Sequence, residues 1–365
     1  MDQQITLGFL VLSYEHEPLY LTNIAKRSKI HRMKCVIFKP EDVELKLMKA
    51  KGKRFNSLTE AWEKASFPIP AFIYDRCFYG KSAEFDEAKK LVHQLKRCKD
   101  IHFLGHGLPN KWSLYCLLKK TPIKQYLPET YLVRNSEDIF NYVKKNRSCI
   151  LKPCFGAGGT GIVALFYHNN RLILKYMIQN KQSVRTFFHE KNVRPFIQQL
   201  IEKNCYLIQP LLPLLNEHHE PFDIRILFQK SKYGSWALQG KGIRIGEKHT
   251  FVSNVAKGAK ILSFNKWLNH KHVNIKQKIL NEIKQIYQIL LPILDQHFSP
   301  LFEIGLDIGF DQKQEKLWIL DINSKPGRKL VLQTNPNQEN NLYDAPLLYA
   351  QFLNLKLHKV GQYDL

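Results

Sequence analysis

The chain has 365 residues, of which 44% are hydrophobic and 12% are aromatic, and it carries a formal net charge of +23. This composition excludes an intrinsically disordered protein, and the length predicts two or three lobes rather than one compact core. The charge predicts attraction to polyanions such as nucleotides, nucleic acid, anionic lipid or an acidic polymer, although lysines spread over a solvated surface explain it equally well.

Several further classes are excluded by short features of the sequence. No stretch reaches the roughly 18–20 apolar residues of a membrane span. The apolar run at residues 5–12 lacks a basic segment before it and a small-residue cleavage site, so it is interpreted as a buried strand and not as a signal peptide. The seven cysteines are scattered and form no CxxC pair, and we expect reduced thiols. Together these features predict a cytoplasmic protein.

The first part of the chain alternates short apolar runs with amphipathic segments. Strands are predicted at residues 5–12, 33–38, 72–74 and 101–104, and helices at residues 19–30 and 84–99. Strands that alternate with helices are typical of a parallel sheet. We therefore expect an N-terminal parallel α/β lobe over residues 1–109.

The rest of the chain predicts two further lobes. The central one, residues 110–205, has predicted elements at 110–118 (a helix capped by Asn110), 130–133, 136–146, 149–152, 162–167 and 172–176, the last two joined by a turn at Asn169-Asn170. The C-terminal one, residues 206–365, has predicted strands near 206–212, 223–229, 235–245, 302–310 and 316–322, and a long helix at 275–297.

A glycine-rich loop runs from Gly156 to Gly161, shortly after Lys152 at the end of a predicted strand. It satisfies GxGxxG, but β-branched and aromatic residues follow it instead of a helix, so a dinucleotide fingerprint is not expected. A Walker A loop would end in Gly-Lys-Ser/Thr, which is absent. The loop is either a tight turn or a hairpin flap whose N–H groups close over phosphates, and Lys152 favours the flap.

Asp307, Asp321 and Asn323 lie on two predicted neighbouring strands. Asp321 and Asn323 are two residues apart and therefore share a face. Asp307 lies in an otherwise apolar strand, where a carboxylate is costly unless it is paired or binds a metal. Hard oxygen ligands suit the Mg²⁺ that accompanies a polyphosphate, and a structural salt bridge is the alternative. Asp223 and Arg225 share a strand face, and Arg244 lies on another predicted strand. For these three residues, internal ion pairs are the alternative to a role in the site.

Together these segments resemble the ATP-grasp enzymes, and within them the YheC/YheD group associated with bacterial endospore coats. The likeness covers nearly the whole chain and rests on residues 110–112, 126–130, 151–161, 223–225, 242–244, 253–254 with 258, and 321–327. It implies an ATP-grasp fold of α/β and α+β class, in which ATP lies between two α+β subdomains that accompany the N-terminal lobe.

The resemblance also implies roles for individual residues. ATP contacts are implied for the phosphate-binding Lys111 and Lys152, for the flap residues Gly156, Gly158, Gly159, Thr160 and Gly161, for Gln209 and the backbone of Leu211 at the adenine, and for Asp223 at the ribose. The transferred phosphoryl group would be held by Arg225 and Arg244 and oriented by Asn254. The Mg²⁺ ligands would be Asp307, Asp321 and Asn323.

The chain departs from the family pattern at two positions. The second metal carboxylate is usually Glu, and Asp321 is shorter by one methylene, about 1.5 Å that a water on Mg²⁺ can bridge. An acid often stands at the position of Gln209, whose carboxamide oxygen also accepts a hydrogen bond from the adenine amino group.

The leading hypothesis is ATP-dependent ligation of a carboxylate to an amine through an acyl-phosphate, which needs positioning and charge stabilisation but no covalent nucleophile. The alternative is an ATP-binding structural protein of the spore coat that does not turn over. We expect acidic substrates, small molecules or peptides that supply the carboxylate and the amine, and spore coat proteins as candidate partners. Nucleic acid is not expected, because RRM and KH signatures are absent.

Overall fold

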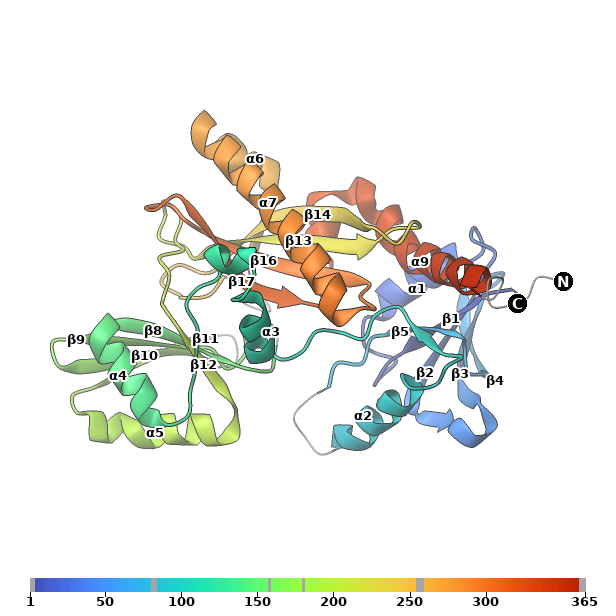
Figure 1. Ribbon diagram of the computed structural model, residues 1–365, viewed down its shortest axis with the longest axis horizontal. Coiled ribbons are helices and arrows are strands. Elements are labelled where there is room, and N and C mark those ends of the chain that lie inside the picture. The colour runs from blue at the N-terminus through green and yellow to red at the C-terminus, as the bar shows by residue number, and fades with distance from the viewer. Residues whose placement is uncertain (1–3, 80–83, 157–158, 179–180, 254–258, 361–365) are drawn as a thin grey trace.

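The computed structural model describes residues 4–79, 84–156, 159–178, 181–253 and 259–360. Figure 1 shows an N-terminal lobe in blue, a central subdomain in green and a C-terminal subdomain in yellow to red. Within the described residues each part is built on a sheet of its own, with six, six and five strands respectively. No helix among these residues combines the length and the apolar character needed to cross a membrane.

The N-terminal sheet has the strand order β4-β3-β2-β1-β5-β6. Its parallel part was predicted and comprises β1 (Thr6–Leu10), β2 (Lys34–Glu44), β5 (Phe72–Asp75) and β6 (His102–Phe103), with α1 (Pro18–Arg27) and α2 (Glu84–Leu95) between them. The parallel sheet is confirmed in these strands, and β3 (Lys49–Asn56) and β4 (Ala61–Pro68) add an antiparallel hairpin at one edge that was not predicted. This edge hairpin is rich in lysine and offers no apolar run to detect; η1 (Leu45–Leu47) precedes it.

The central sheet has the order β11-β10-β9-β8-β12-β7 and is antiparallel. Its strands are β7 (Tyr131–Leu132), β8 (Ser148–Pro153), β9 (Val163–His168), β10 (Arg171–Ile178), β11 (Lys181–Phe187) and β12 (Tyr206–Gln209). Asn169 and Asn170 both have positive φ, 47° and 58°, as the predicted tight turn requires. One face is covered by α4 (Ser136–Asn146) and α5 (Glu190–Lys203), which bury Ile139, Phe140, Val193 and Ile197 against the strands.

The C-terminal sheet has the order β15-β14-β13-β16-β17. The strands are β13 (Phe222–Lys230), β14 (Trp236–Ile245), β15 (Lys260–Ser263), β16 (Glu303–Asp311) and β17 (Lys316–Asn323). One face packs against α6 (Phe264–Asn269), the long α7 (Val273–Phe298), α3 (Lys111–Leu118) and η2 (Pro122–Tyr126). Because Leu114, Leu118, Ile123 and Tyr126 are buried in this core, the segment that opens the predicted central lobe at residue 110 packs with the C-terminal subdomain instead.

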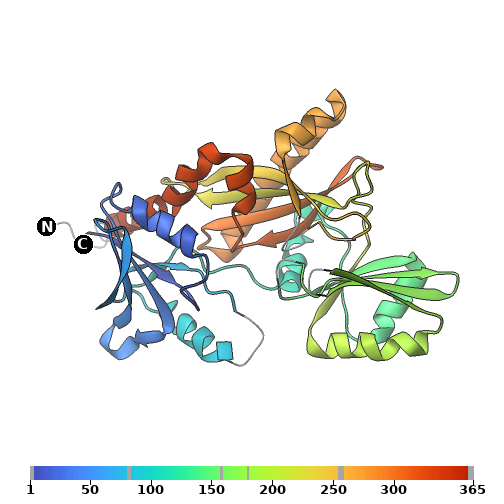
Figure 2. The same ribbon diagram turned by 180° about the vertical axis from the view of Figure 1, so that it is seen from behind.

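The last helices connect the C-terminal subdomain to the N-terminal lobe. After β17 the chain forms α8 (Lys329–Thr334), η3 (Pro336–Gln338) and α9 (Glu339–Val360). α9 lies beside α1, as Figure 2 shows from behind, and its Leu342 and Leu347 are buried in one core with Leu21 and Ile24 of α1.

A buried ion-pair cluster links the same two parts. Arg76, 1% exposed, contacts both Glu17 and Glu303, and Arg328 contacts the same two carboxylates at 3.0 and 2.7 Å. Because a buried charge left without its partner is costly, this cluster fixes the N-terminal lobe against the C-terminal sheet.

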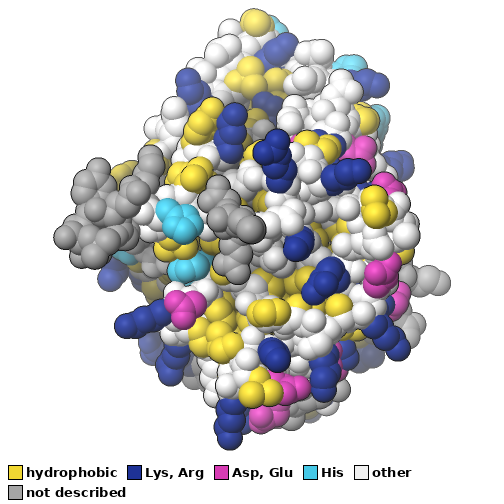
Figure 3. All heavy atoms as spheres, turned by 90° about the vertical axis from the view of Figure 1, so that its right-hand side faces the viewer, with side chains coloured by type: hydrophobic (Ala, Val, Ile, Leu, Met, Phe, Trp, Pro, Cys, Tyr) yellow, Lys and Arg dark blue, Asp and Glu magenta, His cyan; other side chains and the backbone are white. Residues whose placement is uncertain are grey.

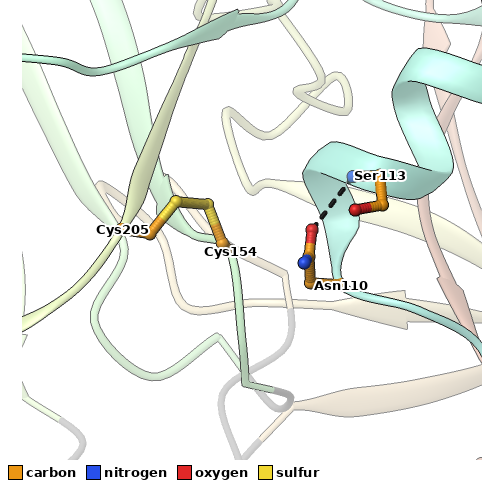
Figure 4. Close-up of a disulfide and its surroundings, with 4 residues drawn as sticks. All are labelled: Asn110, Ser113, Cys154 and Cys205. Carbon is orange, nitrogen blue, oxygen red and sulfur yellow. Dashed lines mark hydrogen bonds between the residues drawn. A yellow bond between two sulfur atoms is a disulfide. The ribbon is translucent and has the colours of Figure 1, made fainter.

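The expectation that all cysteines are reduced was wrong for one pair. Cys154 and Cys205 form a disulfide, with a Cα–Cα distance of 5.4 Å (Figure 4). The cause is the antiparallel pairing of β8 with β12, which sets Pro153 opposite Tyr206 and therefore brings the two neighbouring cysteines together. The backbone N–H of Cys154 donates to the carbonyl of Cys205 at 2.8 Å. The other five cysteines are free.

Candidate functional site

A cavity of about 720 Å³ lies between the central sheet and the C-terminal sheet. It is lined by these residues of the predicted site: Lys111, Lys152, Gly156, Gly159, Thr160, Gln209, Leu211, Asp223, Arg244, Asp307 and Asp321. Gly161, Arg225 and Asn323 are neighbours of lining residues, whereas Gly158 and Asn254 lie outside the described residues. The fold therefore brings together positions that are up to 210 residues apart in the sequence.

The glycine loop joins β8 to β9 at one end of this cavity. Gly156, Gly159 and Gly161 have φ of 126°, 79° and 78°, a region that side chains with a Cβ rarely adopt. The carbonyl of Gly161 accepts a hydrogen bond from Tyr206 Oη at 2.9 Å. At its start, the carbonyl of Cys154 accepts from the backbone N–H of Lys111 at 3.0 Å. The loop is thus anchored at both ends, to β12 and to α3.

Two lysines reach the cavity from different elements. Lys111 is the first residue of α3, which begins there because the Asn110 side chain accepts from the Ser113 N–H at 2.9 Å (Figure 4). Its Nζ forms an ion pair with Asp321. Lys152 lies on β8, and its Nζ donates to the carbonyl of Leu320 at 3.4 Å. Burial lowers the pKa of Lys152 to about 8, although the nearby Asp321 acts in the opposite direction.

A row of charged side chains crosses four strands of the C-terminal sheet. In the sheet register Asp223 pairs with Arg244, Arg225 with Asp307, and Asp307 with Asp321. Arg244 donates to both oxygens of Asp223 at 2.7 Å and contacts Asp307 at 2.9 Å. Arg225 Nε lies 2.8 Å from Asp307 Oδ1. The two aspartates hold both arginines in fixed positions, and they outweigh burial in raising the pKa of Arg244, so this guanidinium stays charged.

Asp223 is already engaged on both carboxylate oxygens. Besides Arg244 it accepts a hydrogen bond from Ser253 Oγ, which ties the segment at residues 246–253 to the sheet. Its side chain is buried. The contact with a ribose therefore stays a prediction, and in the described structure Asp223 orients Arg244.

The predicted metal ligands offer hard oxygens at one place. Asp307 and Asp321 are direct neighbours on β16 and β17, and the Asn323 carboxamide donates to Asp321 at 3.3 Å. Asp307 Oδ1 is buried and, apart from its ion pair with Arg225, has no hydrogen-bond partner among the described residues, so it has a lone pair to offer. Burial would raise the pKa of Asp321, but Lys111 and Lys152 outweigh it and the pKa is lowered. This donor set fits Mg²⁺. Since the described residues hold no group of three or more His, Cys, Asp or Glu side chains, a metal here rests on two carboxylates and one carboxamide.

One part of the cavity wall is mostly apolar. Gln209 ends β12, and the segment after it contributes Pro210 through Leu215 to the wall. The Gln209 Nε2 group donates to Thr130 Oγ1 at 2.8 Å, whereas its Oε1 is buried without a partner among the described residues. An apolar slot with an unsatisfied acceptor suits a flat heterocycle that carries an N–H group.

Sequence reasoning missed some of the lining. Phe166 and Lys175 on β9 and β10 face the cavity, with Lys175 Nζ 5.3 Å from the Phe166 ring centre. A lysine inside the apolar run of β10 was the signal for it. The segment from Lys248 to Ser253 also lines the cavity, and no sequence pattern marked it beyond Ser253 itself.

Comparisons with known proteins identify the family of this chain. A family model described as YheC/D like ATP-grasp matches residues 100–353. The endospore coat-associated protein YheC of Bacillus subtilis is 36% identical over 350 residues, which cover 96% of this chain and 96% of that protein. Tetrahydromethanopterin:alpha-L-glutamate ligase of Methanocaldococcus jannaschii is 24% identical over 238 residues, which cover 62% of this chain and 65% of that protein.

Solved structures share the fold at low sequence identity. D-alanyl-alanine synthetase A from Vibrio cholerae superposes with a TM-score of 0.54 at 12% identity, covering 95% of this chain and 99% of that one. A RiPP-associated ATP-grasp ligase of Chryseobacterium gregarium, solved with ADP and a leader and core peptide, gives 0.53 at 12% identity, covering 94% and 96%. The resemblance expected from the sequence is confirmed: the chain belongs to the YheC/D-like ATP-grasp family.

Proposed function

We propose that the chain is an ATP-dependent carboxylate–amine ligase that forms an amide or peptide bond through an acyl-phosphate. The observation that carries this proposal is the convergence of Lys111, Lys152 and Arg244 with Asp307 and Asp321 in one cavity between two sheets. Cations there suit a polyphosphate, and the paired aspartates suit its metal ion.

In this proposal the chain acts by positioning charge. A substrate carboxylate oxygen attacks the γ-phosphorus of ATP and ADP leaves; the amine nitrogen then attacks the acyl carbon, phosphate leaves, and the nitrogen loses a proton. Lys111 and Lys152 hold the phosphates, and Arg225 and Arg244 face the phosphoryl group as it is transferred. Mg²⁺, held by Asp307, Asp321 and Asn323, would neutralise phosphate charge when bound.

The base of ATP is assigned to the apolar wall that follows Gln209. Gln209 and the backbone of Leu211 would meet the adenine, and the glycine loop would cover the phosphates. Asp223 is proposed to orient Arg244, because both of its oxygens are already occupied. A cluster fixed before ATP binds needs little rearrangement during the reaction, which is the usual source of electrostatic catalysis.

We propose acidic substrates, small molecules or peptides that bring a carboxylate and an amine. The net charge of +23 favours them, and the Methanocaldococcus jannaschii relative is named as a glutamate ligase. The Bacillus subtilis relative is named as an endospore coat-associated protein, which supports spore coat proteins as proposed partners, and we also propose a cytoplasmic location.

The test is release of ADP and phosphate from MgATP in the presence of paired acids and amines. The panel contains glutamate, glutamate-rich peptides and small polycarboxylates, each with and without an amine. We expect ADP release that requires both partners and a product whose mass equals their sum less one water. ADP release that needs no acid would contradict acyl-phosphate formation.

A second candidate is an ATP-binding coat protein without turnover. It is favoured by Asp321, which replaces the usual Glu and is already neutralised by Lys111. It predicts that calorimetry detects MgATP binding while no acid and amine pair releases ADP. Restored turnover in Asp321→Glu would show that the shorter side chain is the cause.

A further inference from the structure

The Gln209 carboxamide is held from behind by a residue that does not line the cavity. Thr130 precedes β7 and its side chain is buried. Its hydroxyl donates to the carbonyl of Pro128 at 2.9 Å, and its Oγ1 accepts from Gln209 Nε2 at 2.8 Å. The backbone N–H of Thr130 donates to Tyr115 Oη at 3.2 Å, which fixes Thr130 in turn.

Counting protons determines the orientation of the carboxamide. A hydroxyl has one proton, and once it is donated to Pro128 the oxygen of Thr130 can only accept. The Gln209 group that faces it must therefore be the NH₂. In the reversed orientation two acceptors would meet, or Thr130 would give up its bond to Pro128, and either change costs a hydrogen bond in a buried place.

The fixed orientation leaves Gln209 Oε1 as the atom without a protein partner among the described residues. A buried acceptor without a partner is unfavourable, so a ligand that supplies an N–H group gains from filling it. Adenine carries an exocyclic amino group at the position where guanine carries a carbonyl oxygen. An acceptor at this point therefore binds the first base and repels the second.

We infer that Thr130 is a positioning residue that selects adenine over guanine by fixing the Gln209 carboxamide. The inference rests on the proposed ATP site and adds to it a residue that does not touch the nucleotide. It explains how a carboxamide can serve at this position. A carboxamide presents its oxygen reliably only when a partner fixes its orientation, whereas a carboxylate presents an acceptor in either orientation.

The experiment measures MgATP and MgGTP affinity by calorimetry on the full chain. The wild type should bind ATP more tightly than GTP. Thr130→Val removes the hydroxyl while keeping the shape, so the carboxamide is free to reverse and the ratio of the GTP to the ATP dissociation constant should fall about tenfold. Thr130→Ala should act in the same way, and Thr130→Ser should keep the wild-type ratio. Thermal unfolding confirms that each variant is folded.

The same Thr130 substitution in a Gln209→Glu variant distinguishes an effect on the orientation of the carboxamide from an effect on packing. In Gln209→Glu the carboxylate has no donor to misplace, so adding Thr130→Val should leave the nucleotide ratio of Gln209→Glu unchanged. An equal fall in both backgrounds, or no fall in either, would overturn the role of Thr130. ATP binding with an unchanged ratio refutes this inference alone, whereas a wild-type chain that binds no ATP refutes the proposed function as well.

Discussion

At the scale of single residues, the charges of the cavity compensate one another. Asp307 contacts both Arg225 and Arg244, and Asp321 contacts Lys111, so each predicted metal ligand already has a cation beside it. Two of these cations lie deep in the sheet, while Lys111 and Asp321 are 24% and 22% exposed. Removing one partner therefore has different consequences at the two aspartates.

Asp307→Asn and Asp321→Asn should both abolish ADP release but differ in stability. The first leaves two buried arginines without their shared carboxylate, and we expect a loss of about 3–5 kcal/mol in the free energy of unfolding. The second breaks one partly exposed pair, and we expect a loss of about 1 kcal/mol or less. Urea denaturation measures both, with Asp321→Glu as the control that retains the charge. Equal losses would contradict the assigned partners.

Lys152 should make ATP affinity depend on pH. Its pKa of about 8 means that the ammonium loses its proton as the pH rises through 8, and only the charged form attracts phosphate. ATP affinity should therefore be nearly constant from pH 7 to 8 and fall about tenfold per unit above it. Lys152→Arg, which stays charged, should remove this fall. Lys152→Ala should weaken binding about 10- to 150-fold at pH 7. Calorimetry across this range decides, and a fall that persists in Lys152→Arg would exclude Lys152 as its source.

At the scale of elements, prediction succeeded where local chemistry determines the structure. α4 has the predicted bounds, and its capping box of Asn135 and Asp138 is complete in the structure. The Asn169-Asn170 turn also formed as expected. β3 and β11 were missed because both are polar strands near or at sheet edges, where one face or edge meets solvent and no apolar run results.

Long-range partners could not be predicted from the sequence. The disulfide of Cys154 with Cys205 depends on β12 pairing with β8, which no local pattern states. The sequence indicated which residues belong to the candidate site, but it did not indicate which of them contact one another. The hydrogen bond from Ser253 to Asp223, for example, is seen only in the folded structure. The same holds for Thr130, whose position behind Gln209 becomes visible only in three dimensions.

The start of α3 gives a test at this scale. Asn110→Ala removes the cap that satisfies the Ser113 N–H, so the free energy of unfolding should fall by about 1 kcal/mol. Asn110→Asp keeps an acceptor and should restore most of it. Because Lys111 is the next residue, ATP affinity should fall with the loss of the cap. Urea denaturation and calorimetry measure the two effects, and unchanged values for both would exclude a role for the cap.

At the scale of the whole molecule, basic residues are spread rather than concentrated. Figure 3 views the end formed by the N-terminal lobe and shows Lys and Arg side chains scattered over it, with fewer Asp and Glu side chains between them. Residues 131–205 hold 12 Lys and Arg but only 4 Asp and Glu, so the subdomain that carries the glycine loop contributes strongly to the field. A field of this kind acts on the encounter of ligands more than on bound complexes.

The acidic-substrate proposal therefore predicts a salt effect on kinetics. For the substrate acid, kcat/KM should fall steeply between low and physiological ionic strength while kcat changes little, because steering raises encounter rates by roughly 10- to 1,000-fold at low salt. A neutral substrate of similar size is the control, and the effect of salt on ATP binding is subtracted. A flat response, or a preference for the neutral substrate, would refute the acidic class.

The helix α9 also sets the order in which this protein becomes complete. Synthesis starts with the N-terminal lobe, but the core of that lobe closes only with Leu342, Leu347 and Ala350, close to the end of the chain. Until these residues are synthesised, the core that α1 shares with the N-terminal sheet lacks the side chains of α9, although the central subdomain already has all of its own core. We expect that such a chain does not complete its lobes strictly in the order of synthesis, because the N-terminal lobe gains the last part of its core only when α9 packs against it.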